Sequence, residues 1–309
     1  MSESVCVVLA TYNPVQNFFI QQIESIRRQT HTQWTCIIQD DFSGKKEFKE
    51  ILSVISEDER FSIEKNKENL GVFKTFEAGL RRVPPNCNFI ALADQDDIWN
   101  ENKLEVCVRE LQSNTEIALV HSDLELIDES NKTIQKSCWS FEKRKILNHD
   151  QDLLLVRNIV TGCSCVFKKK VLKKALPFPL QSKRDSFYHD IWITLKALEF
   201  GEIKPIFEPL VHYRQHTNNQ VGVDLNKNNL LFQQVKKHLN NDLSSLFKCY
   251  LKQYESLNDL LNFQVFQNGE TSTFDWLRSR IFKLIKIDYR NSRLLLVLLV
   301  AYLKEKDCL

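Results

Sequence analysis

The segment "NFIALADQDDIW" (residues 88–99) joins a short apolar run to a group of carboxylates. Residues 88–94 have the composition of a strand that is buried on both faces of a sheet. Asp94, Asp96 and Asp97 lie within four consecutive positions, and carboxylates this close repel one another. A bound cation, a helix N-terminus or exposure to water would offset that repulsion.

Three more strand-like segments precede this one, at residues 5–11, 34–40 and 61–66. Between them lie segments with helical periodicity, among them residues 45–57 and 72–80. Strands that alternate regularly with helices are typical of an α/β fold. We therefore predict a doubly wound, mostly parallel sheet, with ligands bound beyond the carboxyl ends of its strands.

Three of the four predicted strands end in polar side chains. Thr11 ends the first, Asp40 and Asp41 end the second, and Asp94 and Asp96 follow the fourth. Because parallel strands end at the same edge of a sheet, we expect these side chains to lie along one edge.

The pattern changes in the second half of the chain. Residues 117–128 predict another strand, 161–176 a strand that runs into a basic helix, and 189–201 an amphipathic helix. Beyond residue 224 the sequence is polar, with few helix breakers. We therefore expect one domain over residues 1–223 and a helical region over 224–309.

Composition sets further bounds. A net charge of +2 gives no general reason to expect a nucleic-acid partner. Nine cysteines without a C-x-x-C pair, and an N-terminus without a basic leader, predict a cytoplasmic location. Cys163 and Cys165 form a C-x-C pair that lacks the second pair of a zinc site.

The carboxylate group at 94–97 has three interpretations. A D-x-D at a strand end suits Mg²⁺ or Mn²⁺, which bind few protein oxygens and leave positions open for phosphates. An EF-hand loop starting at Asp94 is excluded, because Trp99 stands where that loop needs glycine and Ile98 occupies a ligand position. In the third interpretation Asp97 or Asn100 caps the following helix.

Several short motifs occur in a family's order. They are "VVLATYNP", "IIQDDFSG", "NLGVFKTFEAGL", "ADQDDIW", "TGCSCVF", "HDIWI" and "HYRQHTNNQVG". Over about residues 4–222 the chain thereby resembles the family 2 nucleotide-sugar glycosyltransferases, which have the GT-A fold. The later motifs are most similar to the bacterial rhamnosyltransferase branch. Each motif is weak by itself, so their common order carries the resemblance.

The resemblance implies roles on the nucleotide side. Thr11, Tyr12 and Asn13 are expected to line the nucleotide pocket. Asp41, with Asp40 beside it, is expected to accept a hydrogen bond from a pyrimidine N3–H, which thymine and uracil both offer.

It also implies a metal site. Asp96 is expected to bind the metal that bridges both phosphates of the donor. Asp94 is either a ligand, directly or through water, or a contact to the ribose or donor sugar. Asp97 is expected to cap the next helix, Gly71 to turn the backbone near the ligand, and Lys74 to meet a phosphate or lie at the surface.

The acceptor side follows from the later motifs. Asp190 is expected to be the base for the acceptor hydroxyl, although a helix start is also where an Asp caps. His189 would orient that base or the acceptor, and Gly162 would place backbone near the donor or acceptor sugar. His216, with Arg214 second, is expected to bind the metal or the diphosphate.

These roles predict an inverting, metal-dependent sugar transfer. The expected donor is dTDP-rhamnose, with another UDP- or dTDP-sugar as the alternative, and the acceptor is a growing bacterial surface polysaccharide or lipid-linked glycan. A non-catalytic sugar-nucleotide-binding scaffold and a nucleotidyltransferase are the rivals outside the class. The latter would have a Gly-rich, basic loop after the first strand, and "ATYNP" has none.

The C-terminal segment 276–304 mixes basic and apolar residues. That composition fits a helix on the cytoplasmic face of an inner membrane. A helical hairpin packing its own apolar face, or a dimer contact, is the alternative. The apolar run 294–303 is too short to span a bilayer.

Overall fold

The computed structural model forms two compact units. The first, here called the sheet unit, comprises Met1–Gln151, Asn158–Phe178 and Tyr188–Thr217, and the remaining segments form the second. All candidate site residues belong to the sheet unit. The structure describes residues 3–144, 146, 151–181, 187–217, 223, 254–255, 257–261, 272–287 and 297.

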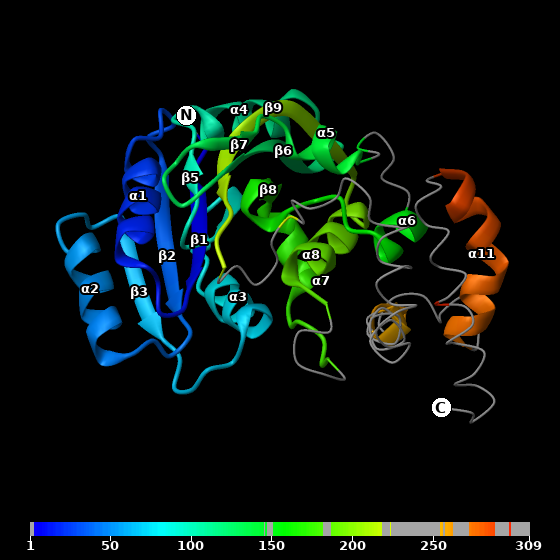
Figure 1. Cartoon of the computed structure of the whole chain (residues 1–309), viewed down its shortest axis with the longest axis horizontal. Helices are drawn as coiled ribbons and strands as arrows, with labels where there is room; N and C mark the ends of the chain where they lie inside the picture. Colours follow the sequence, from blue (N-terminus) through cyan, green and yellow to red (C-terminus); the bar gives the residue numbers. More distant parts are fainter. Residues whose placement is uncertain are drawn as a thin grey trace, which may run out of the picture. The chain divides into compact units, whose positions relative to one another are not determined.

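In the described part of the chain, nine strands make one mixed sheet (Figure 1). Along the main path the order is β3-β2-β1-β4-β8-β6-β9-β5, and β7 pairs with β6. The first four strands run parallel, whereas β8 is antiparallel to both of its neighbours. The strands are β1 (Val5–Thr11), β2 (Trp34–Asp40), β3 (Phe61–Lys65), β4 (Phe89–Ala93), β5 (Ile98–Trp99), β6 (Ile117–Ile127), β7 (Thr133–Gln135), β8 (Cys165–Lys168) and β9 (Glu202–Arg214).

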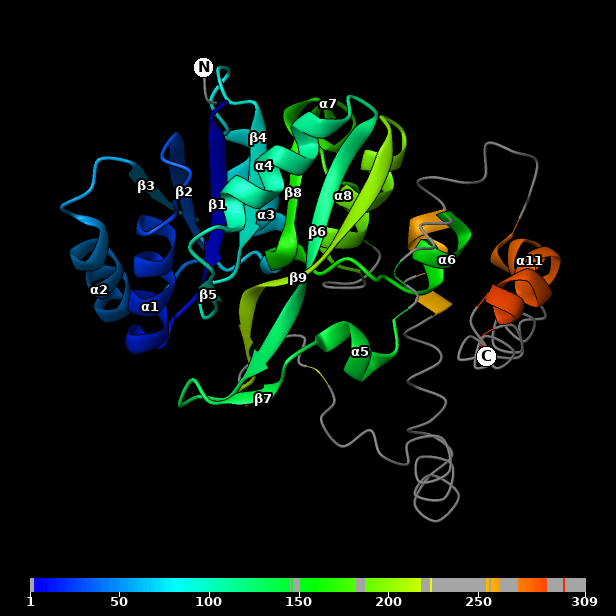
Figure 2. The same cartoon turned by 90° about the horizontal axis from the view of Figure 1, so that it is seen from above.

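Helices cover this sheet (Figure 2). Because β1, β2 and β3 advance in one direction and β4 returns to the other side of β1, right-handed crossovers place α1 and α2 on one face and α3 on the opposite face. The helices of the sheet unit are α1 (Gln16–Arg27), α2 (Lys45–Ile55), α3 (Val72–Arg81), α4 (Lys103–Ser113), α5 (Cys138–Glu142), α7 (Leu172–Ala175) and α8 (His189–Leu198), with 3-10 turns η1 (Gly162–Ser164) and η2 (Lys169–Val171). The second unit holds α11 (Thr273–Ile287) and, except for its first residue, α6 (Gln151–Val156).

The register brings the predicted strand ends together. Thr11 pairs with Asp40, and the last pair between β1 and β4 is Leu9 with Ala93. The carboxyl ends of β1, β2 and β4 therefore lie side by side, as expected. We call this side of the sheet the ligand edge.

The sequence pattern did not predict β9. Residues 212–214 end this strand, which pairs with β6 and β5. Pro205 and Pro209 obscure the strand pattern, and the β6–β9 register shifts between Ser122 and Asp123, next to Pro209.

The basic segment near the C-terminus includes α11. One face of this helix is buried, which fits the alternative in which the segment packs its own apolar face. No helix among the described residues is long and apolar enough to cross a membrane. The apolar run 294–303 lies outside the described residues, apart from Val297. The buried apolar positions described in α11 are Trp276, Leu277, Ile281 and Leu284, and Thr273 at its start is buried as well.

Candidate active site

The loop that follows β1 is held by side chains from the neighbouring strands. The Gln95 Oε1 accepts hydrogen bonds from the Thr11 Oγ1 (2.8 Å) and the Tyr12 N–H (2.8 Å), and its Nε2 donates to the Tyr12 carbonyl (3.3 Å). The N–H of Asn13, a residue in the left-handed region at φ 40°, donates to the Ser43 Oγ (2.8 Å). The predicted nucleotide-pocket residues 11–13 therefore form one fixed loop, from which the Tyr12 side chain is 45% exposed.

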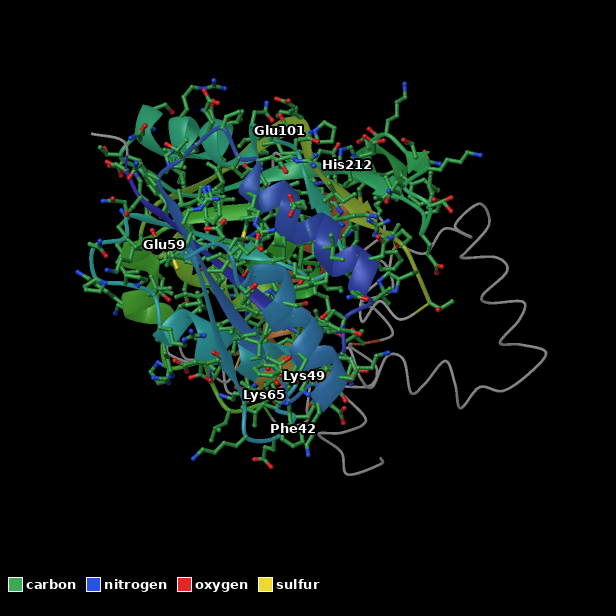
Figure 3. The ribbon with its side chains drawn as sticks, turned by 90° about the vertical axis from the view of Figure 1, so that its left-hand side faces the viewer. Phe42, Lys49, Glu59, Lys65, Glu101 and His212 are labelled. Carbon is green, nitrogen blue, oxygen red and sulfur yellow. The ribbon has the colours of Figure 1, made fainter. Side chains whose placement is uncertain are left out.

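The end of β2 forms the adjoining wall. Ser43 donates to the buried Asp40 carboxylate from both its N–H and its hydroxyl, and burial raises the pKa of Asp40. Phe42 has a φ of 68°, which is uncommon for a non-glycine residue, and its ring is half-exposed. The Lys65 ammonium lies 5.3 Å from that ring (Figure 3). A half-exposed aromatic ring, that of Phe42, thus follows Asp40 and Asp41 in the sequence at the end of β2.

Asp41 holds the loop before α3. Its Oδ1 accepts from the Asn66 amide (2.9 Å) and the Leu70 N–H (2.7 Å), and its Oδ2 from the Asn69 amide (2.9 Å) and the Gly71 N–H (2.9 Å). A carboxylate has about four acceptor sites, so these donors fill it. A base N3–H would have to displace one of them, and the base-binding role of Asp41 stays a prediction.

Gly71 and Lys74 begin α3. Gly71 precedes the helix with φ 83°, a left-handed conformation that glycine adopts without steric cost. The Lys74 ammonium forms a 2.7 Å ion pair with Glu77, which also pairs with Arg81. Lys74 is therefore held by its own helix, and its expected phosphate contact stays a prediction.

In the segment after β4, the Asp96 carboxylate contacts His216, which lies two residues beyond the end of β9. The Asp96 Oδ2 lies 2.8 Å from the His216 Nε2, and both side chains are largely buried. The ring of Phe18 packs 5.6 Å from the His216 ring. Two of the three residues that the sequence assigns to the metal, Asp96 and His216, are thus in direct contact.

Asp94 and Asp97 lie in a crowded anionic environment. Burial raises the pKa of Asp94 to about 7, with the charges of Asp96 and Asp190 adding to the effect. Ligand atoms of Asp94, Asp97 and Cys163 lie within 4.8 Å of one another. Asp94 and Asp190 are therefore close enough to interact electrostatically.

The prediction that Asp97 caps the following helix is wrong. The chain forms β5 directly after Asp97, and α4 begins only at Lys103, where the preceding Asn102 makes no side-chain cap. Asp97 is instead fully buried, and its Oδ1 accepts from the Arg214 N–H (3.2 Å).

Arg214 differs from its expected role as a diphosphate ligand. Its side chain is fully buried, and its guanidinium lies 4.3 Å from the Phe18 ring centroid. Because it already donates to four protein oxygens, Arg214 braces the site. These acceptors are the Asp96 carbonyl (2.8 Å), the Gln21 Oε1 (2.7 Å), the Asp128 carbonyl (3.2 Å) and the Asn131 Oδ1 (2.5 Å).

Asp190 lies in the first turn of α8 and does not cap it, because the helix begins after Tyr188. Its Oδ1 accepts from the Ile191 N–H (2.7 Å), and the Gly162 N–H also stabilises the carboxylate. Burial outweighs these bonds and raises the pKa of Asp190 to about 6.

His189 is packed between an aromatic ring and a glycine. Its ring stacks on Phe76 with centroids 3.7 Å apart, and burial lowers the His189 pKa to about 3, so the imidazole is neutral. A Cβ at Gly162 would lie 2.7 Å from the His189 Nε2. Only glycine therefore lets η1 approach the start of α8 this closely.

Comparison with known proteins gives the family. The protein-family model described as "Glycosyl transferase family 2" matches residues 6–176 of the chain. The chain belongs to glycosyl transferase family 2. It is therefore a glycosyltransferase, and neither a nucleotidyltransferase nor a non-catalytic scaffold.

Relatives of this glycosyltransferase cover about two thirds of its length. It is 30% identical to "Uncharacterized glycosyltransferase MJ1057" of Methanocaldococcus jannaschii, over 68% of this chain and 70% of the relative. It is 25% identical to the Escherichia coli "UDP-Glc:alpha-D-GlcNAc-diphosphoundecaprenol beta-1,3-glucosyltransferase WfgD", over 62% and 69%. The chain spans only 31% of the "Bifunctional glycosyltransferase pgtA" of Dictyostelium discoideum, to which it is 26% identical.

A solved structure agrees in fold. S. aureus TarS 1-349, crystallised in complex with UDP-GlcNAc, matches with a TM-score of 0.55 and 14% identity, over 94% of this chain and 81% of the TarS 1-349 chain. This likeness supports the GT-A fold of the glycosyltransferase.

The donor atoms of this glycosyltransferase fit a hard divalent cation. Neighbouring ligands in an octahedral Mg²⁺ site are about 3 Å apart, close to the Asp96–His216 separation of 2.8 Å. The Cys163 thiol is a poor ligand for such a cation, because burial raises its pKa well above the ordinary value. The spacing of Asp96 and His216 therefore suits Mg²⁺ or Mn²⁺, and the metal-binding roles of Asp94, Asp96 and His216 stay a prediction.

Sequence reasoning missed Gln95 and Ser43. Gln95 is the variable residue of the D-x-D pattern, and Ser43 lies in the "IIQDDFSG" motif with no role expected for it. The parallel register offers a signal for Gln95, because it follows the last β1–β4 pair at the same spacing as Thr11. Nothing in the local pattern shows that Ser43 also anchors Asn13.

Proposed function

We propose that this glycosyltransferase moves a sugar from a nucleoside-diphosphate donor to a hydroxyl of a glycan or lipid-linked acceptor, with inversion. The observation that carries the proposal is the 2.8 Å contact between Asp96 and His216. The charges of Asp96 and Asp190 both act on the neighbouring Asp94 carboxylate. This arrangement sets a carboxylate suited to deprotonating a hydroxyl near a site suited to a diphosphate and a cation.

On the donor side, Thr11–Asn13 and the end of β2 would receive the nucleoside. The exposed rings of Tyr12 and Phe42 supply apolar surface for a base. Asp94, Asp96 and His216 would hold the divalent cation. When bound, that cation neutralises negative charge on the departing nucleoside diphosphate.

On the acceptor side, Asp190 would take the proton of the attacking hydroxyl. A base with a pKa of about 6 is ionised at neutral pH yet basic enough to accept a proton in the transition state. With one such base and direct attack on the anomeric carbon, a single displacement inverts that carbon. His189 and Gly162 would shape the space beside the base.

We infer that the donor is a dTDP- or UDP-sugar. The motifs similar to the rhamnosyltransferase branch favour dTDP-rhamnose. The name of WfgD and the TarS complex favour UDP-glucose or UDP-GlcNAc as alternatives. The WfgD name, which includes a diphosphoundecaprenol-linked sugar, supports a lipid-linked acceptor.

A donor panel tests this function. The purified chain would be incubated with Mn²⁺ or Mg²⁺ and with dTDP-rhamnose, UDP-glucose or UDP-GlcNAc, and the released nucleoside diphosphate measured. We expect metal-dependent release with one donor and little with the others. Lack of binding and turnover with every nucleotide sugar would overturn the proposal.

The outer face of α11 supports contact with an anionic membrane surface. Arg278, Phe282 and Lys286 lie four residues apart along the helix, and the Phe282 ring is 81% exposed. An aromatic ring between basic residues suits an anionic headgroup layer. Vesicle flotation tests this: Phe282→Ser should weaken binding to vesicles containing phosphatidylglycerol, and binding unchanged by the substitution would contradict the contact.

A further inference from the structure

Gln95 occupies a special position in the sheet register. β1 and β4 pair with a constant offset from Val5 with Phe89 to Leu9 with Ala93. Continued by two residues, the same offset sets Thr11 opposite Gln95. The backbone pairing ends before this point.

The Gln95 side chain bonds across the gap. Its carbonyl accepts from both the Thr11 hydroxyl and the Tyr12 N–H, at 2.8 Å each, and its NH₂ donates to the Tyr12 carbonyl. The amide thus makes the paired N–H and C=O bonds that a neighbouring strand would make. It continues the β1–β4 connection where the two backbones separate.

This connection joins the two halves of the donor site. On one side it fixes the backbone of the loop expected to receive the nucleoside. On the other, Gln95 stands between Asp94 and Asp96, which suit the cation. The distance between the nucleoside and diphosphate positions therefore depends on the Gln95 side chain.

We propose that Gln95 is a positioning residue that couples nucleoside binding to metal–diphosphate binding. The inference rests on the proposed function and deepens it. With Gln95 in place, one donor molecule can reach both the cation at Asp94 and Asp96 and the loop at residues 11–13. Without it, each half still binds its part, but occupation of one half favours the other less.

Gln95→Met is the informative variant, because methionine keeps the length of the side chain and removes all three hydrogen bonds. Since Gln95 is only half-buried, we expect melting close to wild type. Gln29→Met is the matched control. Gln29 is a buried glutamine that also makes three bonds, to Ser25, Asn100 and Leu104, and it lies outside the candidate site.

Calorimetry measures the coupling. Dissociation constants of UDP and dTDP would be determined with and without Mn²⁺, for wild type and both variants. We expect Mn²⁺ to tighten binding of the preferred nucleotide in wild type and in Gln29→Met. In Gln95→Met the tightening should shrink about tenfold, within the usual range of coupling between sites, and UMP or dTMP binding without metal separately measures any effect on the nucleoside half alone.

The outcomes are distinguishable. Equal tightening by Mn²⁺ in wild type and Gln95→Met would overturn the role of Gln95 and leave the proposed function intact. An equal loss in Gln29→Met would show a general structural effect and also overturn it. A wild-type chain that binds neither nucleotide, with or without Mn²⁺, would overturn the inference together with the proposed function.

Discussion

The Asp96 Oδ2 and the His216 Nε2 are separated by 120 positions in the sequence and by 2.8 Å in the structure. β9 makes this contact, because its pairing with β5 and β6 carries the following residues back to the end of β4. Arg214 secures the approach by bonding the Asp96 carbonyl from the same strand end. The pair is the firmest point of the candidate metal site.

Removal of Asp96 tests that site. We expect Asp96→Ala to lower kcat/KM by at least about a hundredfold, because loss of a metal ligand weakens the binding of both the cation and the donor diphosphate. A Mn²⁺ titration of turnover would measure the effect, with Glu125→Gln, a change at the His212 ion pair, as the control. Full metal-dependent turnover in Asp96→Ala would contradict the assignment.

Asp190→Asn tests the base. The amide keeps the shape of the side chain but cannot take a proton at neutral pH. We expect transfer to fall about 10²–10⁴-fold, while calorimetry finds donor binding close to wild type. Undiminished transfer would refute the base role.

The pH dependence of transfer should follow the same group. Because the pKa of Asp190 is raised to about 6, the base is protonated below that pH. We expect kcat to fall about tenfold per pH unit under pH 6 in a plot of log kcat. A flat profile between pH 7 and 5 would contradict it.

Stability should change in the opposite sense. The native pKa of Asp190 lies above the ordinary value of 3.8, so the native state holds the proton more tightly than the unfolded state between these values. This group therefore favours folding as the pH falls from 6 toward 4. Denaturant unfolding of Asp190→Asn should lack this contribution, and identical pH slopes in both proteins would exclude it.

Gly162→Ala should disturb the base without reaching the nucleoside loop. The added Cβ would lie 2.7 Å from the His189 Nε2, and the stack on Phe76 limits movement of that ring. Overpacking of this kind costs about 1–3 kcal/mol. We expect a lower melting temperature and a lower kcat with little change in donor KM.

Gly44→Ala is the matched control for this change. There the new Cβ meets the far end of the flexible Glu47 side chain, which can move aside. If kcat falls as far in Gly44→Ala as in Gly162→Ala, the explanation that the Gly162 variant acts through His189 is contradicted.

Arg214→Met tests the brace. Methionine fills much of the volume but leaves the Gln21 Oε1 and the Asp96 carbonyl without their donor. A buried acceptor left unsatisfied costs about 1–3 kcal/mol, so we expect at least that loss in unfolding free energy. Wild-type stability with a raised donor KM would instead support diphosphate binding.

The strand ends could be predicted from sequence because they depend on local pattern and on one topological rule. β1 and β2 match their predicted ranges, and Thr11, Asp40 and Asp94 lie along one edge as expected. The buried position of Asp97 could not be predicted. The two-residue strand β5 follows it directly, so that α4 begins only at Lys103.

Contacts between segments that lie far apart in the sequence could not be predicted either. Burial of Arg214 depends on acceptors from α1 and from the turn after β6, which no spacing in the sequence connects. Saturation of Asp41 depends on the backbone path of residues 66–71. Motif order identified which residues gather, whereas their hydrogen-bond partners required the fold.

The reversed direction of β8 has a chemical consequence. Parallel strands present carbonyl groups where they end, so an all-parallel ligand edge would be rich in acceptors and poor in donors. β8 runs the other way and brings its amino-terminal side to that edge, preceded by η1. The Gly162 N–H that stabilises Asp190 comes from this reversal. One backward strand thus supplies positive polarity beside a rim of carboxylates.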